Sequence, residues 1–283
     1  MEWSIKGKTV LVTGATSGIG LAACIQLASR GARLVMVGRD PSRTQAAVQT
    51  VRDSTGAEPD SLLCDFSRQA SIRALAKAYA DKYDRLDVLV NNAGGVNKTR
   101  RLTEDGMEMT FAVNHLGPFL LTNLLLDLIV ASSPARVVTV SSIGHRSGTL
   151  DFDDLFFERG YRIMAAYNRS KLANVLFANE LARRLEGTGV TSNSMHPGAV
   201  ATNIWAGAPP WDKPIIWLFM RPTFLSPEKG AEPLVRLVCD PELAGVTGCY
   251  FERHRQVDPA PAAQDEELAA RLWTVSAELV CLT

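Results

Sequence analysis

Short apolar runs alternate along the chain with longer stretches in which apolar residues recur at helical spacing. Alternation of strand and helix patterns predicts an α/β fold: a single doubly wound, Rossmann-type domain over residues 1–283, with a mainly parallel seven-stranded sheet and helices on both faces. The predicted strands are 9–12, 33–38, 62–64, 86–90, 136–140, 189–195 and 248–251, and the predicted helices are about 21–30, from 41, 67–83, 103–133, 163–185, 227–239 and from about 265.

The segment 203–226 breaks this alternation. It is rich in aromatic and proline residues and carries little charge. Since it follows the sixth predicted strand, we expect an irregular lid that covers the substrate and lines an apolar cleft. Two other interpretations remain open: these aromatic residues pack on the domain's own core, or they form a subunit or peripheral membrane contact. The aromatic residues are Trp205, Trp211, Trp217, Phe219 and Phe224.

Composition narrows the class of protein. The 283 residues are 46% hydrophobic and 21% charged, and 30 basic residues balance 30 acidic ones, so no global field favours nucleic acid as a partner. The start of the chain has no signal-peptide pattern, and the most apolar run, 119–131, is too short to span a bilayer. We therefore expect a cytoplasmic protein. The five scattered cysteines predict neither a disulfide framework nor a metal site.

A glycine-rich turn joins the first predicted strand to the first helix. Glycines allow a tight turn and a close approach of phosphate, and the helix N-terminus offers N–H donors, so this arrangement predicts dinucleotide binding. The alternative is a tight turn that binds nothing. The candidate cofactor residues here are Gly14, Thr16, Ser17, Gly18, Ile19 and Gly20.

The end of the second predicted strand bears on cofactor choice. An NAD site usually places a carboxylate there, whereas a nearby arginine accommodates the 2′-phosphate of NADP. The sequence has Gly38 and then Arg39, with Asp40 placed to cap the next helix. We therefore expect NADP(H), against the alternative that Arg39 is a solvated charge. After the third strand, Asp65, followed by Phe66, could contact adenine or cap the following helix.

Small and polar residues also follow the later strands. Asn91, Ala93 and Gly94 end the fourth strand, where open α/β sheets place ligands. Asn114 lies in an apolar helical stretch, where its amide must find partners; it could mend a helix kink or hold a catalytic water. We expect each of the four histidines to have a structural role.

Tyr167 and Lys171 stand four residues apart, on one face of a predicted helix. A nearby ammonium favours the phenolate and lowers the pKa of a tyrosine, which suits acid–base catalysis. Most such pairs, taken alone, are two surface side chains. The other motifs of the chain favour the catalytic interpretation of this pair.

Together these motifs resemble the short-chain dehydrogenase/reductase family over nearly the whole chain, and most of all its retinol-dehydrogenase-like branch. The matching residues are Thr13-Gly14-x-x-x-Gly18-x-Gly20, Asn91-Asn92-Ala93-Gly94, Asn114, Ser142, Tyr167-x-x-x-Lys171 and Pro197-Gly198-x-x-x-Thr202. We expect the chain to differ from membrane-bound members of that branch in having no N-terminal transmembrane helix.

The resemblance implies roles for these residues. Tyr167 would donate the proton, Ser142 would hold the oxyanion, and Lys171 would bias the tyrosine and bind the nicotinamide ribose. Asn114 would hold a water that links Lys171 to solvent. The carboxamide would be held in the segment that contains Pro197, Val200 and Thr202.

The expected activity is NADP(H)-dependent interconversion of a carbonyl and an alcohol on a lipophilic aldehyde or ketone. Two alternatives remain: a reductase of the same family that acts on a polar or carrier-bound carbonyl, and a non-catalytic NADP(H)-binding or sensing protein. The sequence leaves a homo-oligomer open.

Overall fold

Alternate residues of the central strands point to opposite faces of one sheet, and this alternation builds two apolar layers. The computed structural model describes residues 3–200 and 225–282. On β1, Leu11 faces one layer, while Val10 and Val12 face the other. The strands are β1 Thr9–Thr13, β2 Arg33–Gly38, β3 Asp60–Leu63, β4 Val88–Asn91, β5 Ala135–Val140, β6 Val190–His196, β7 Tyr250–Glu252 and β8 Arg255–Gln256.

The sheet has the strand order β3-β2-β1-β4-β5-β6-β7-β8. All neighbouring strands are parallel except β7 and β8, which pair antiparallel. The expected mainly parallel α/β sheet is confirmed, but the expected number of seven strands is wrong because β8 adds an eighth. Two residues are too few to show an alternating pattern in the sequence. The order reverses between β1 and β4, where sheets of this kind open a crevice for ligands.

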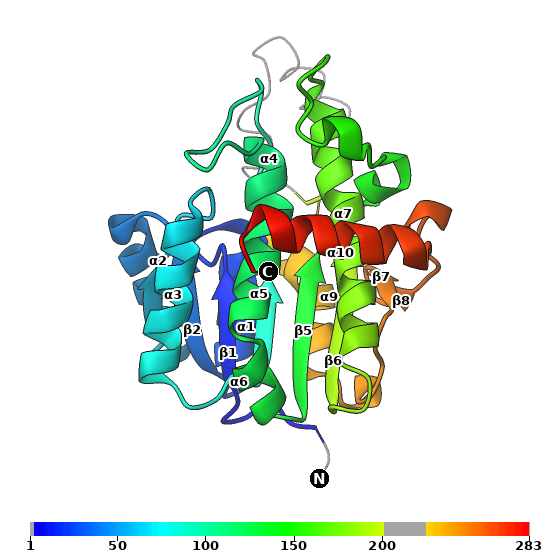
Figure 1. Ribbon diagram of the computed structural model, residues 1–283. Helices are drawn as coiled ribbons and strands as arrows, with labels where there is room; N and C mark the ends of the chain where they lie inside the picture. The colour runs from blue at the N-terminus through cyan, green and yellow to red at the C-terminus, as the bar shows by residue number, and fades with distance from the viewer. Residues whose placement is uncertain (1–2, 201–224, 283) are drawn as a thin grey trace.

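Helices cover both faces of the sheet (Figure 1). Apolar residues of α1, α2 and α9 form one core with the sheet, and those of α3, α5, α7 and α10 form the other. The helices are α1 Gly18–Ala28, α2 Pro41–Thr55, α3 Gln69–Lys82, α4 Met109–Phe111, α5 Gly117–Leu124, α6 Leu126–Ala131, α7 Ile163–Arg184, α9 Pro227–Cys239 and α10 Glu266–Leu279. No helix within 3–200 or 225–282 is long and apolar enough to cross a membrane.

The long helix expected over 103–133 is wrong as a single element. The helical region begins at Met109 and contains a π-helical turn at Ala112–Leu116, called η1 here, between α4 and α5. Glu108 precedes it and accepts hydrogen bonds from the N–H groups of Thr110 and Phe111, which fixes the helix start six residues later than predicted. Asn114 lies within η1. Such π turns are frequent at functional sites.

Candidate active site

The glycine-rich turn leaves no room for side chains. Gly14 and Gly18 have positive φ angles of 66° and 55°. A Cβ at Gly14 would lie 2.9 Å from the Cα of Ala93, and one at Gly20 would overlap the carbonyl oxygen of Gly14. The turn is thus pressed against the end of β4, and only glycine fits at these positions.

An amide that the sequence prediction passed over braces this turn. Asn92 donates from Nδ2 to the carbonyl of Thr13 at 2.9 Å and to that of Gly14 at 3.2 Å. Asn91, the predicted candidate, is buried and donates instead to Thr122 at 3.0 Å. Neighbouring residues at a strand end face opposite sides of the sheet, and only the register decides which one meets the turn.

The N-terminus of α1 is open to an anion. Ser17, its N-cap, makes no side-chain hydrogen bond to the helix, and the first turn holds no acidic residue. Ile19 packs partly buried against the apolar layer. Thr16 lies against Gly38 at the end of β2, where an added Cβ would lie 2.5 Å from its methyl carbon. This cradle suits the phosphates of a dinucleotide.

Two aspartates and an arginine follow the ends of β2 and β3. Asp40 accepts from the N–H of Arg43 at 2.8 Å, so its predicted role as the α2 cap is confirmed. Arg39 is exposed and, within the described part of the chain, has no hydrogen bond or ion pair. The carboxylate of Asp65 accepts from the backbone N–H and hydroxyl of Ser67 at 3.0 and 2.7 Å.

Because Arg68 is the N-cap of α3, the interpretation of Asp65 as the cap is wrong, and its adenine contact stays a prediction. Phe66 is buried against the start of α5, where a Cβ on Gly117 would lie 2.7 Å from its ring. The Phe66 ring therefore packs inside the fold, and its contact with the cofactor stays a prediction.

Two candidate catalytic residues, Ser142 and Tyr167, meet where β5 ends and α7 begins. Ser142 follows β5, and its Oγ accepts from the N–H of Gly144 at 3.2 Å. Tyr167 is buried on α7, and a hydrogen bond with Ser142 bears on its pKa. Ser141 is occupied elsewhere, since its hydroxyl donates to the carbonyl of Lys171 at 2.7 Å. The geometry therefore favours Ser142 over Ser141 as the partner of Tyr167.

Lys171 is buried beside Tyr167 and is turned toward the end of β5. Its Nζ lies 5.6 Å from the centre of the tyrosine ring and donates to the carbonyl of Val140 at 3.1 Å. Burial lowers the pKa of Lys171 to about 8. Burial also raises the pKa of Tyr167, and the hydrogen bond with Ser142 opposes that rise. That Lys171 lowers the pKa of Tyr167 stays a prediction.

Asn114 ties the π-helical turn to two other segments. Its Oδ1 accepts from the N–H of Gly95 at 2.7 Å, and its Nδ2 donates to the carbonyl of Gly95 and to the Oγ of Ser170, both at 2.9 Å. A Cβ on Gly94 would lie 3.1 Å from Oδ1 and 3.6 Å from the Nζ of Lys171. Asn114 is thus buried within reach of the lysine, and its role in holding a water stays a prediction.

The described residues just after β6 lie beside Leu225 and the start of α9. Pro197 is buried, and Val200 packs against Gly230 at the start of α9. The N–H of Leu225 donates to the carbonyl of Ala199 at 2.7 Å. Thr202 and residues 203–224 of the predicted lid 203–226, with all five aromatic residues, lie outside the described residues.

His145 is the histidine that best fits the structural role expected for each of the four. It is fully buried, and both of its ring nitrogens are hydrogen bonded. His115 is also fully buried and is bonded to Ser276 through Nε2, but its Nδ1 has no partner in the described structure. Burial lowers the pKa of His196 to about 4, and its Nδ1 is likewise buried without a partner there. His254 is exposed and has a 3.8 Å contact with Glu232.

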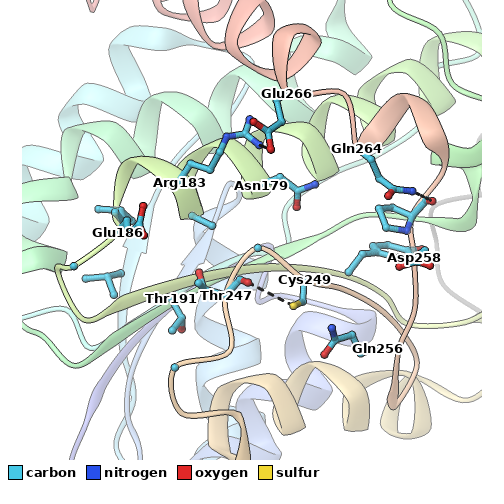
Figure 2. Close-up of a pocket in the computed structure, with 18 of the residues that line it drawn as sticks. Asn179, Arg183, Glu186, Thr191, Thr247, Cys249, Gln256, Asp258, Gln264 and Glu266 are labelled. Carbon is cyan, nitrogen blue, oxygen red and sulfur yellow. Dashed lines mark hydrogen bonds and ion pairs between the residues drawn. The ribbon is translucent and has the colours of Figure 1, made fainter.

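A cavity of about 600 Å³ lies away from these groups. Figure 2 shows it between the C-terminal half of α7, with Asn179 and Arg183, and the segment that carries Gln264 and Glu266. It begins beside Val190, at the N-terminal end of β6, whereas the candidate catalytic residues lie at the opposite end of the strands. None of the predicted site residues lines it.

Comparison with known proteins decides the family. The model of the short chain dehydrogenase family matches residues 8–213, which include the glycine turn and the Tyr167–Lys171 pair. The chain belongs to the short-chain dehydrogenase family. Its expected place in the retinol-dehydrogenase-like branch is also confirmed. Human retinol dehydrogenase 13 is 44% identical over 99% of this chain and 86% of its own length, and human retinol dehydrogenase 14 is 44% identical over 98% and 87%.

Solved structures agree with this short-chain dehydrogenase fold. An uncharacterised protein from Mycobacterium paratuberculosis is 32% identical, with a TM-score of 0.80, covering 99% of this chain and 96% of its own. An NADP active-site complex of RhlG from Pseudomonas aeruginosa is 26% identical, with a TM-score of 0.71, covering 88% and 95%.

The family binds a nicotinamide cofactor, and the residues present fit one. The turn at Gly14–Gly20 excludes side chains where a dinucleotide's phosphates would approach, and the N-terminus of α1 has no competing carboxylate. The chain is therefore an oxidoreductase of this family, related to retinol dehydrogenases, and of the kind that interconverts carbonyls and alcohols.

Proposed function

We propose that this short-chain dehydrogenase reduces lipophilic aldehydes or ketones with NADPH, and that Tyr167 is its general acid and base. The observation that carries the proposal is the meeting of Ser142 and the buried Tyr167 at the same edge of the sheet as the glycine turn. A phenol is protonated at neutral pH and can donate its proton to a carbonyl oxygen.

The bound nicotinamide would supply the hydride. As the carbonyl oxygen becomes negative, Ser142 would donate a hydrogen bond to it and Tyr167 would transfer its proton. Lys171, one helical turn beyond Tyr167, and Asn114, in η1, would help to hold the cofactor and to return a proton from solvent to Tyr167. The buried carbonyl of Val140 orients the lysine for this role.

Preference for NADPH rests on Arg39. Its guanidinium is exposed at the end of β2, one residue beyond Gly38, and makes no hydrogen bond or ion pair within the described ranges. It is thus available for a 2′-phosphate, while Asp40 is occupied as a helix cap. The NADP complex of the Pseudomonas aeruginosa relative supports the same choice.

Two exposed apolar side chains support a lipophilic substrate. Ile143 follows Ser142 directly, and Met164 lies one helical turn before Tyr167; they are 47% and 44% exposed. Apolar groups of this size beside catalytic residues suit an apolar substrate. The names of the retinol dehydrogenase relatives point the same way.

The test is NADPH consumption against a homologous series of aldehydes. If the cleft is apolar, each buried methylene contributes up to about 0.8 kcal/mol, and kcat/KM rises with chain length before it levels off. A wild-type series without this rise, or a preference for small charged carbonyls, would contradict the lipophilic substrate. Absence of turnover together with tight NADPH binding would favour the sensing alternative.

A further inference from the structure

A fully buried histidine lies one turn beyond Ser142 and has no part in the chemistry described above. His145 belongs to the 3₁₀ turn Ile143–Ser147, called η2 here. Its Nδ1 lies 2.8 Å from the carbonyl oxygen of Ser142, and its Nε2 lies 3.1 Å from the backbone nitrogen of Ala260. The imidazole packs on the ring of Tyr250 with 4.6 Å between centres.

These two partners fix the protonation of the ring. A carbonyl oxygen can only accept a hydrogen bond, so Nδ1 must carry a proton. The N–H of Ala260 can only donate, so Nε2 must carry none. Only the neutral imidazole with its proton on Nδ1 satisfies both contacts. In the charged form, Nε2–H would face the N–H of Ala260, and that buried N–H would lose its acceptor.

The contacts join the turn that carries Ser142 to the helix that carries Tyr167. Ala260 directly precedes the short turn Pro261–Ala263, and the amide of Asn179, on α7, donates to the carbonyl of Ala263 at 3.0 Å. At the other end of this segment, Arg146 donates to the carbonyl of Asp258 at 3.1 Å. His145 is therefore the internal connection between the Ser142 turn and a segment anchored on α7.

We propose that His145 is a positioning residue: in its neutral form it fixes the carbonyl of Ser142, and so places the Ser142 hydroxyl relative to Tyr167. The inference rests on the proposed function, because it gives the Ser142 hydroxyl its importance. Protonation of His145 sets Nε2–H against the N–H of Ala260; this repulsion displaces the ring, and with it the carbonyl of Ser142, and so lowers turnover on the acid side.

Several titratable groups surround the ring. Arg146 disfavours its charged form and Glu252 favours it, while Tyr250 lies against the ring and His196 is close enough to interact with it. Burial is the leading influence and lowers the pKa of His145 below its usual 6.5. The loss of turnover is therefore expected below pH 6.5, on the acid side of neutrality.

Two substitutions separate the two contacts of the imidazole. The amide of His145→Asn reaches the place of Nδ1 and can still donate to Ser142. The longer amide of His145→Gln reaches the place of Nε2 and can still accept from Ala260. We expect kcat of His145→Asn to stay within about threefold of wild type, and that of His145→Gln to fall about tenfold or more, with KM for NADPH unchanged in both.

The pH profile gives an independent reading. The acid decline of kcat in the wild type should be absent from His145→Asn, which has no group that titrates there. Ser276→Ala is the matched control for lost stability, because it removes the hydrogen bond of the other fully buried histidine, His115, without touching Ser142. Its kcat and pH profile should equal those of the wild type.

A measurement that does not require turnover tests the role of His145 independently of the proposed function. The amide N–H of Gly144 donates to the Ser142 hydroxyl, so its NMR resonance should shift in His145→Gln and not in His145→Asn. An equal loss of kcat in both variants, an acid decline that persists in His145→Asn, or a Gly144 resonance that moves equally in both would overturn the inference. Were the wild type to reduce no carbonyl, the proposed function would fall, and the Gly144 resonance would still decide the role of His145.

Discussion

The candidate site at the carboxyl ends of the strands has two halves, and different kinds of residue build them. At β1, β2 and β4 the site consists of glycines pressed against backbone, with the amide of Asn92 as the brace. At β5, β6 and α7 it consists of ionisable side chains, the buried Tyr167 and Lys171 and the partly buried His196, whose pKa values are shifted by burial. We propose that the first half recognises the cofactor by shape and that the second transfers the proton. Substitutions in the first half should therefore weaken cofactor binding, whereas those in the second half should slow the chemical step.

The largest effect is expected on the proton side. Tyr167→Phe keeps the ring and removes the hydroxyl, so kcat should fall by about 10²-fold or more. The affinity for NADPH, measured by titration of cofactor fluorescence, should stay near that of wild type. Near-normal turnover of a confirmed substrate would refute the assignment of Tyr167.

Charge reversal at Arg39 tests the cofactor side. Arg39→Asp should weaken NADPH binding by roughly 1.5–3 kcal/mol, the value of a hydrogen bond to a charged group, and leave NADH binding unchanged. Arg30→Asp, two residues beyond the end of α1, is the control, since the Arg30 side chain donates to the carbonyl of Gln26 and makes no ion pair within residues 3–200 and 225–282. Equal affinity of the wild type for both cofactors would exclude the proposed role of Arg39.

Steric crowding of the glycine turn should affect binding alone. A Cβ at Gly20 would overlap the carbonyl oxygen of Gly14, so Gly20→Ala should weaken both cofactors by about 1–3 kcal/mol, as overpacking does elsewhere. Gly95→Ala is the control nearer the catalytic side, since a Cβ there meets nothing within 4 Å. Unchanged cofactor affinity in Gly20→Ala would show that the turn does not hold the dinucleotide.

The smallest effect concerns stability and pH. Burial lowers the pKa of His115 to about 3, below the value of about 6.5 expected in the unfolded chain. Its contribution to stability is present above pH 6.5 and is lost as pH falls, by about 0.7 kcal/mol between pH 7 and pH 6. Urea unfolding of wild type and His115→Leu at both pH values measures it, because the other histidines cancel. An identical pH dependence would contradict the burial effect.

The sequence predicted best what local patterns determine. The strand Arg33–Gly38, the helix Pro227–Cys239 and the cap at Asp40 were placed at their observed bounds because apolar runs, prolines and capping residues act locally. The π-helical turn around Asn114 was beyond such reasoning. It depends on hydrogen bonds to Gly95 and Ser170, which are distant in the chain.

Within the site, the residue types could be predicted from the sequence, but the directions in which their side chains point could not. The spacing of Tyr167 and Lys171 places both on one helical face, yet the lysine turns to the carbonyl of Val140, an acceptor that only the folded sheet supplies. The choice between Asn91 and Asn92 likewise follows from strand register. His145 shows the same limit, since its partner Ala260 is 115 residues away.

One paired measurement tests the division between the two halves most directly: the Kd for NADPH and the single-turnover rate of carbonyl reduction, both determined in Tyr167→Phe and in Gly20→Ala. The account predicts a crossed result. Tyr167→Phe should bind NADPH normally and reduce the substrate at least about 10²-fold more slowly, whereas Gly20→Ala should bind NADPH weakly and, once saturated, reduce at a rate near that of wild type. Parallel losses of binding and rate in both variants would contradict it.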